Sequence, residues 1–203
     1  LVRAAQVPDT ATLMDYYESA HTRDSDYVAI DSDFDGTARL DRIRRYLGSG
    51  GRVIEIGSGD GTFCRMLARA GFDATGIDPL VGNAHRATGE FDAVLSYLVL
   101  EHVTTPAEFL SDAARLLQLG GYLIVEVPDF LRNPVASLDP EHIWHFAPDH
   151  LRVLIGRLGF AVVEVDRTGA SRPFAQAVVA RKESTANSDE PVVGQHLVAA
   201  MRD

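Results

Sequence analysis

The sequence is informative first for what it lacks. It contains a single cysteine, Cys64, which excludes an internal disulfide and a zinc site built from cysteines. No apolar run approaches the ~18 residues of a membrane-spanning helix, and no signal-peptide pattern opens the chain, so we expect a cytoplasmic location. Basic residues are also few: 19 Lys and Arg stand against 29 Asp and Glu, which gives a net charge of −10. That balance argues against nucleic acid or an anionic membrane surface as the main partner.

The length of 203 residues fits one domain, and 46% apolar and 24% charged residues are ordinary for a globular protein. We expect residues 1–36 to form an N-terminal lid segment and residues 37–182 to form the domain. Residues 183–203 are predicted to be a polar linker followed by a C-terminal helix. The chain begins with Leu1 and not with Met, so we expect either a processed chain or a piece of a longer protein. From the linker composition and the late helix we expect the tail to lead into another domain or to contact a partner.

Helical and strand-like patterns alternate through the predicted domain. Helices are expected at 37–47, 63–70, 108–117 and 149–158. Strands are expected at 52–56, 73–77, 91–97, 122–127, 161–165 and 175–180. This alternation predicts an α/β fold with a mostly parallel sheet that helices cover on both faces. The last two strands have no room for a crossover helix between them, so they should pair antiparallel.

A glycine-rich turn, with Gly57, Gly59 and Gly61, follows the first of these strands and opens a helix. Nucleotide-like ligands bind at this junction in open α/β sheets, because glycines let the backbone approach the ligand. The Gly-x-Gly-x-Gly spacing does not fit the dinucleotide fingerprint, which disfavours an NAD-dependent oxidoreductase. Glu55 suits a cationic ligand group, and Asp78 ends the second strand, where a carboxylate can accept both ribose hydroxyls. The alternative is a tight turn without a ligand, in which Asp78 only caps a helix.

This turn and three further motifs resemble the class I S-adenosylmethionine-dependent methyltransferases. The other motifs are residues 91–103, which end in Leu-Glu-His-Val, residues 116–125, which contain a Gly-Gly pair, and Leu-Gly-Phe at 158–160. The resemblance covers roughly residues 35–182 and implies a Rossmann-like sheet with S-adenosyl-L-methionine as the cofactor. The residues that it implies at the cofactor are Glu55, Gly57, Ser58, Gly59, Asp60, Gly61, Asp78, Pro79, Leu80, Ser96 and Tyr97.

One region departs from the family pattern. Only eleven residues, 80–90, separate Pro79 from the strand at 91–97, where the family fits a full helix and a third strand. We therefore expect a shortened third-strand region. The family's acid that contacts the adenine amino group has no clear match. Adenine is expected to rest on Leu80 and backbone groups, or on an element outside this chain.

A dense run of histidines and acids occupies residues 139–150, after the strand expected at 122–127. Its pair Glu141-His142 resembles a Glu-His pair with acid–base roles at the acceptor in sugar and small-molecule methyltransferases of this superfamily. Asp139 stands where such sites often have a tyrosine, which disfavours methylation of a carbon. We expect His142 to be the general base, with Glu141 and His145 as further catalytic residues. The alternative is that His142 braces its loop and that His145 packs before the next helix.

Three residues are expected at the substrate. Trp144 either stacks on a flat face of the substrate or anchors its loop. Tyr17 either belongs to a lid over the site or packs in an amphipathic helix. His102 lies in the turn after the strand expected at 91–97, and it is a better candidate for a capping role than for a base. The histidines in the run 139–150 lack the ligand spacing of a zinc site, so we expect no metal.

The sequence thus predicts an S-adenosylmethionine-dependent methyltransferase. The expected acceptor is a small molecule or a carbohydrate, and the expected position is a hydroxyl. The alternative is a non-catalytic, methyltransferase-like module of a larger enzyme or assembly, which the shortened third-strand region and the predicted tail both favour.

Overall fold

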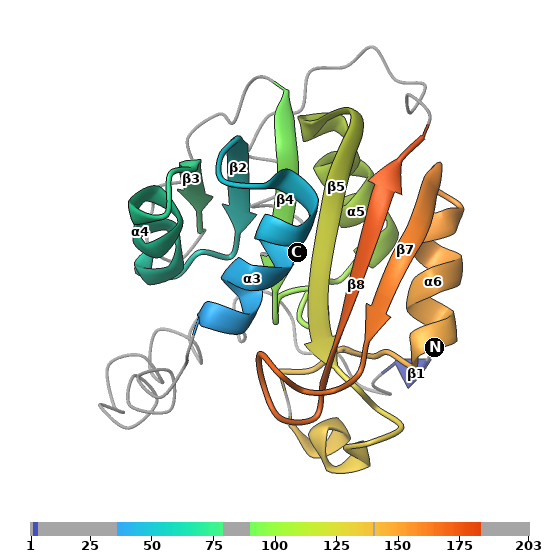
Figure 1. Ribbon diagram of the computed structural model, residues 1–203. Helices are drawn as coiled ribbons and strands as arrows, with labels where there is room; N and C mark the ends of the chain where they lie inside the picture. The colour runs from blue at the N-terminus through green and yellow to red at the C-terminus, as the bar shows by residue number, and fades with distance from the viewer. Residues whose placement is uncertain (1, 4–35, 79–89, 140, 184–203) are drawn as a thin grey trace.

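A six-stranded sheet forms the centre of the molecule (Figure 1). The computed structural model describes residues 2–3, 36–78, 90–139 and 141–183. The strand order is β3-β2-β4-β5-β8-β7. The bounds are β2 (Arg52–Ile56), β3 (Asp73–Ile77), β4 (Phe91–Tyr97), β5 (Leu117–Pro128), β7 (Phe160–Asp166) and β8 (Ala175–Lys182). The first four strands in this order run parallel, and β8 is antiparallel to both β5 and β7. The predicted sheet is confirmed, including its antiparallel last strand.

Within the described residues, four helices cover the two faces of this sheet (Figure 1). They are α3 (Thr37–Leu47), α4 (Thr62–Arg69), α5 (Pro106–Leu116) and α6 (Pro148–Gly156). Successive residues of a strand point to opposite faces, so each strand contributes to two cores. Val53 and Leu95 pack with apolar residues of α3 and α4 on one face. Ile54 and Val94 pack with α5 and α6 on the other.

The largest difference from the predicted bounds is at β5. This strand begins at Leu117, directly after α5, and not at residue 122. Gly120 takes a φ of +82°, and the register between β4 and β5 shifts between Phe91 and Ala93, opposite this stretch. The chain therefore bulges at the glycines and continues as strand.

A second, two-stranded sheet was not predicted from the sequence. β1 (Val2–Arg3) pairs antiparallel with β6 (Trp144–His145), and a 3₁₀ helix, η1 (Pro134–Leu138), precedes β6. Two-residue strands carry too little pattern to be recognised in a sequence. β1 nevertheless brings the start of the chain beside the predicted acceptor loop.

Several predictions fall outside the described residues. They concern most of the lid segment with Tyr17, Pro79 and Leu80 with the shortened region that follows them, and the tail at 184–203. Among the residues that the structure does describe, no helix has both the length and the apolar character to cross a membrane.

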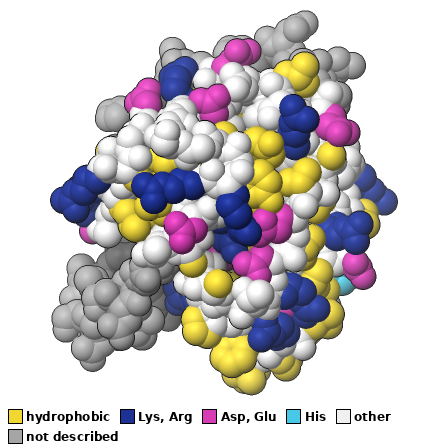
Figure 2. All heavy atoms as spheres, viewed as in Figure 1, with side chains coloured by type: hydrophobic (Ala, Val, Ile, Leu, Met, Phe, Trp, Pro, Cys, Tyr) yellow, Lys and Arg dark blue, Asp and Glu magenta, His cyan; other side chains and the backbone are white. Residues whose placement is uncertain are grey.

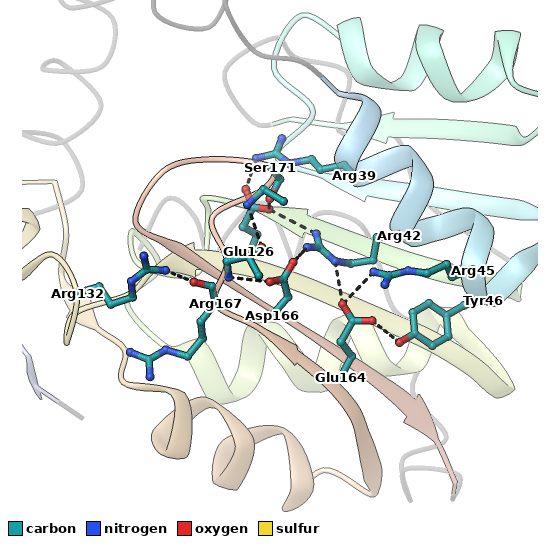
Figure 3. A network of polar contacts seen from close by, with 12 residues as sticks. Arg39, Arg42, Arg45, Tyr46, Glu126, Arg132, Glu164, Asp166, Arg167 and Ser171 are labelled. Carbon is teal, nitrogen blue, oxygen red and sulfur yellow. Dashed lines mark hydrogen bonds and ion pairs between the residues drawn. The ribbon is translucent and has the colours of Figure 1, made fainter.

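A network of ion pairs joins α3 to the sheet (Figure 3). Arg39 reaches the fully buried carboxylate of Glu126 on β5, with 2.5 Å between Nη2 and Oε1. Arg42 pairs with Asp166 on β7, and Ser171 donates to Glu126. Buried pairs of this kind fix geometry more than they add net stability. Figure 2 shows basic and acidic side chains interspersed on this face of the molecule.

Candidate active site

The glycine-rich turn is tied to the end of β3. The N–H groups of Gly57 and Ser58 both donate to the carbonyl oxygen of Ile77, at 2.8 and 3.2 Å. Gly57 takes a φ of +80°, and a Cβ there would lie 2.2 Å from Cγ2 of Val99. Only glycine fits this position, because any side chain would be strained and would collide with the segment after β4.

Asp78 sits against the middle of the turn. Its Oδ2 accepts a hydrogen bond of 2.8 Å from the N–H of Gly59, and the residue is buried. Gly59 has a φ of +51°, and a Cβ built on it would meet no described atom within 4 Å. The turn thus holds a carboxylate in place and leaves the space above Gly59 open to a ligand. This arrangement fits the predicted placement of Asp78 beside a ribose.

Glu55 is a buried carboxylate at the same junction. Its Oε2 accepts a hydrogen bond of 3.1 Å from Sγ of Cys64 on α4. Burial raises the pKa of Glu55 to about 7, against lowering effects from Cys64 and the Arg39 charge. A cationic ligand group would compensate the carboxylate charge and lower this pKa again. The contact of Cys64 with Glu55 was not predicted, because a thiol at helical spacing looks apolar.

Three hydroxyls near the ends of β2 and β4, those of Ser58, Ser96 and Tyr97, are buried without a hydrogen-bond partner among the described residues. Buried polar groups are normally bonded, so a ligand is a candidate partner for the two serine hydroxyls. Tyr97 differs, because its ring lies in the α3–α4 core, under the Arg39 guanidinium at 4.1 Å.

Asp60 lies at the exposed rim of the turn. Its carboxylate accepts from both the backbone N–H and the hydroxyl of Thr62, at 2.8 and 2.7 Å. These hydrogen bonds lower the pKa of Asp60. The side chain therefore braces the first turn of α4 in this structure, and its predicted contact with the cofactor stays a prediction.

The segment after β4, residues 98–102, connects the glycine turn to a second cluster of polar side chains, formed by Glu101, His102 and His142. Val99 faces Gly57, as described above, and the carbonyl oxygen of Glu101 accepts from the N–H of Trp144 at 3.0 Å. Leu98 takes a φ of +57°, which is uncommon for a residue with a branched side chain. Both clusters consequently lie at the carboxyl end of the parallel strands, where α/β proteins bind ligands.

The second cluster consists of Glu101, His102 and His142. One ligand atom from each can be chosen so that all lie within 4.8 Å of one another. The imidazole centroids of His102 and His142 are 4.9 Å apart. The sequence had grouped His142 with His145, but the structure brings it together with His102. Glu101 was missed as a site residue, although an acid beside a histidine just after a strand was the available signal.

Backbone carbonyls orient both imidazoles. Nδ1 of His102 lies 3.0 Å from the carbonyl oxygen of Glu141, and Nδ1 of His142 lies 3.0 Å from that of Ala136. A carbonyl can only accept, so each Nδ1 carries the proton and each Nε2 keeps its lone pair. His102 stays neutral near pH 7, because burial and the neighbouring His142 lower its pKa to about 4.

Glu101 is the most buried member of the cluster, with 1% of its surface exposed. Its Oε1 lies 3.9 Å from Nε2 of His102, and its Oε2 is buried with no hydrogen-bond partner in the described structure. Burial raises the pKa of Glu101 to about 8, although the Arg172 charge acts in the opposite direction. The cluster therefore buries an ionisable carboxyl group beside the neutral imidazole of His102.

The remaining predicted residues surround this cluster without joining it. Glu141 is buried and supplies the carbonyl that orients His102. His145 stacks on Phe130 with 5.6 Å between ring centroids, and burial lowers its pKa. Trp144 is half-buried against the α5–α6 core, and the guanidinium carbon of Arg3 lies 5.4 Å from the centroid of its ring. These contacts support the alternatives in which His145 packs and Trp144 anchors its loop.

Comparisons with known proteins agree with this geometry. A family model described as a methyltransferase domain matches residues 30–165, which is more than half of the chain. The ubiquinone biosynthesis O-methyltransferase of Maricaulis maris (strain MCS10) is 33% identical over 98 residues, or 36% of this chain. The chain covers only 39% of that relative's length.

Solved structures share the fold. The Burkholderia thailandensis 1,6-didemethyltoxoflavin-N1-methyltransferase, with 1,6-didemethyltoxoflavin and S-adenosylhomocysteine bound, has a TM-score of 0.68 at 17% identity. That likeness covers 90% of this chain and 94% of the other. The magnesium protoporphyrin IX methyltransferase of Synechocystis PCC 6803, with S-adenosylmethionine bound, has a TM-score of 0.63 at 19% identity, over 89% of this chain and all of the other.

Proposed function

Because the chain belongs to the methyltransferase-domain family, we propose that it transfers a methyl group from S-adenosylmethionine to a hydroxyl of a small-molecule or carbohydrate acceptor. The observation that carries the proposal is the glycine turn with two buried carboxylates. Asp78 is bound to the N–H of Gly59, and Glu55 lies on the strand that leads into the turn. An adenosyl sulfonium with an amino group offers a matching ribose diol and a matching cation.

The residues at the turn fit this cofactor. Asp78 would accept the ribose hydroxyls, Glu55 would face the cationic amino group, and Gly59 would let the ligand approach the backbone. The unpartnered hydroxyls of Ser58 and Ser96 would supply further hydrogen bonds. When bound, the cofactor supplies an electrophilic methyl group on a positively charged sulfur, so the protein must position the acceptor and remove its proton.

His142 is the base in this proposal. Its Nδ1 is committed to the carbonyl oxygen of Ala136, so the lone pair of Nε2 is available to a hydroxyl. The cofactor would supply the methyl group and its sulfur would keep the electron pair, while Nε2 of His142 would take the proton of the reacting hydroxyl. The products are a methyl ether and a neutral thioether. A base of this kind typically contributes 10²–10⁴-fold in rate.

The names of the relatives support the choice of oxygen as the acceptor atom. Several are called ubiquinone biosynthesis O-methyltransferases, which act on a small molecule. The replacement of a tyrosine by Asp139 is consistent with this choice. The chain spans less than two thirds of the length of those relatives. The acceptor and partners of the whole protein therefore belong to the proposal.

The test is a calorimetric titration of the chain with S-adenosylhomocysteine, followed by a methylation assay on phenolic and sugar hydroxyls with labelled methyl donor. We expect one binding site and label on oxygen. A folded chain that binds no S-adenosylhomocysteine would overturn the proposal and favour a non-catalytic module. Label found on nitrogen or carbon would overturn the choice of a hydroxyl.

A further inference from the structure

We propose that Glu101, His102 and His142 form a binding site for one divalent cation of the zinc type. The three side chains come from two separate stretches of the chain and meet with ligand atoms within 4.8 Å of one another. Two imidazole nitrogens and one carboxylate oxygen are ligands that zinc and similar transition metals prefer. The proposal departs from our expectation of no metal, which had considered only histidines of the run 139–150.

The first support is the orientation of the imidazoles. Each histidine that binds a metal through Nε2 normally donates its Nδ1–H to a carbonyl or carboxylate, which fixes the ring and its tautomer. His102 and His142 both do so, to the carbonyl oxygens of Glu141 and Ala136. The protein therefore orients the rings as it would around a metal, and the backbone already supplies the outer contacts.

The second support is independent of the histidines. Oε2 of Glu101 is buried and has no hydrogen-bond partner among the residues described. A buried acceptor without a partner costs about 1–3 kcal/mol, and more if it is charged. A cation bound by this carboxyl group would offset the cost of burying it.

The spacing of the ligand atoms is close to that of a zinc site. Ligand atoms about 2.1 Å from a tetrahedral zinc are roughly 3.4 Å apart. Oε1 of Glu101 and Nε2 of His102 are already 3.9 Å apart. The carboxylate of Asp139 lies next to the cluster, with Oδ2 3.6 Å from Nε2 of His142, and adds negative charge that favours a cation.

Three protein ligands leave one coordination position open, as in catalytic zinc sites. A hydroxyl bound there would be acidified by the cation, which would replace proton removal by His142. This consequence rests on the proposed function, whereas the cation site itself does not. With the cation bound, Nε2 of His142 is a ligand and cannot also act as a base.

The experiment titrates the EDTA-stripped full chain with zinc sulfate by calorimetry, and measures the bound metal by mass spectrometry after dialysis. We expect one equivalent per chain. Glu101→Gln and His142→Gln should each weaken binding at least tenfold, whereas His150→Gln, on the exposed surface, should leave it unchanged. Equal binding by wild type and both cluster variants, or no binding by wild type, would overturn the site.

Two further measurements keep the result interpretable. If Glu101→Gln does not fold, the absorption spectrum of the Co²⁺-loaded wild type and its loss in His142→Gln serve as the test. A Co²⁺ spectrum that survives His142→Gln would overturn the site. Titration of the same samples with S-adenosylhomocysteine separates the two proposals. A stripped chain that binds S-adenosylhomocysteine but no zinc overturns the cation site alone. A chain that binds zinc but no S-adenosylhomocysteine supports the site and overturns the proposed function.

Discussion

The glycine turn and the Glu101–His102–His142 cluster lie at the same end of the sheet but use their polar groups differently. At the turn, the acids are bonded within the protein: Asp78 to the N–H of Gly59, and Glu55 to the thiol of Cys64. In the cluster, protein contacts fix the ring positions but leave Oε2 of Glu101 without a partner. The backbone shape of the turn therefore limits which residues can stand in it. In the cluster, the limit is the chemistry of the three side chains.

The largest expected effect follows from the shape of the turn. Gly57→Val places a Cβ where Cγ2 of Val99 lies and forces a branched residue to a φ of +80°. Strain and overpacking together should cost about 2–5 kcal/mol of the free energy of unfolding. Gly59→Ala is the matched control, because it meets open space and should cost only about 1 kcal/mol, while weakening S-adenosylhomocysteine binding. Urea denaturation measures the free energy of unfolding of both variants. Equal losses of stability would contradict the expected difference between Gly57 and Gly59.

Substitutions in the Glu101–His102–His142 cluster should change the reaction rate and not the free energy of unfolding. His142→Ala is expected to lower kcat by about two orders of magnitude with the true acceptor, and to leave S-adenosylhomocysteine affinity unchanged. Steady-state kinetics and calorimetry measure the two quantities. The exposed His150→Ala serves as the control. A kcat within threefold of wild type would make His142 a structural residue of its loop.

The turn should respond in cofactor affinity. Asp78→Ala removes hydrogen bonds from a charged group, each worth about 1.5–3 kcal/mol, so S-adenosylhomocysteine affinity should fall at least tenfold. Asp78→Asn keeps an acceptor for the N–H of Gly59 but removes the negative charge. This variant therefore shows whether affinity falls because the charge is lost or because the turn is distorted. Asp73→Asn, at the exposed opposite end of β3, is the control. Affinity that survives Asp78→Ala would remove this residue from the cofactor site.

The last expected effect concerns pH. The folded pKa of Glu55, about 7, lies above its ordinary value of 4.5, so the folded state holds this proton more tightly. The corresponding stability is fully present below about pH 4.5 and is lost as the pH rises through about 7. Glu55→Gln should lack this contribution. The free energy of unfolding of wild type, relative to the variant, should therefore fall between pH 5 and pH 8. A difference that stays constant over this range would refute the burial of a titrating carboxylate.

Local patterns were enough to predict most of the fold. The helix at 37–47 and the strands at 52–56, 73–77 and 91–97 have the predicted bounds, because each has a clear period and a glycine or polar stop. The start of β5 was wrong, since a bulge and a turn use the same glycines. The β1–β6 pair could not be predicted, because its register depends on contacts between distant residues.

The site was predictable to the extent that its residues are close in sequence. Glu55, Gly57 and Gly59 belong to one short stretch, and Asp78 follows the next strand, so their meeting follows from parallel pairing. His102 and His142 are separated by forty positions, and only the folded loops bring them together. The partner of Glu55, Cys64, and the isolation of Glu101 depend on burial, which a sequence does not specify for a single side chain.

The segment after β4 sets a limit on how this protein can vary. Within residues 98–102, Val99 fills the space beside Gly57, and two positions later Glu101 and His102 enter the cluster. An insertion or deletion here would move one of these contacts out of place whichever side chains were chosen. We therefore expect the length of this segment to be fixed. A chimaera with a new acceptor loop should therefore be joined after residue 102 and not before it.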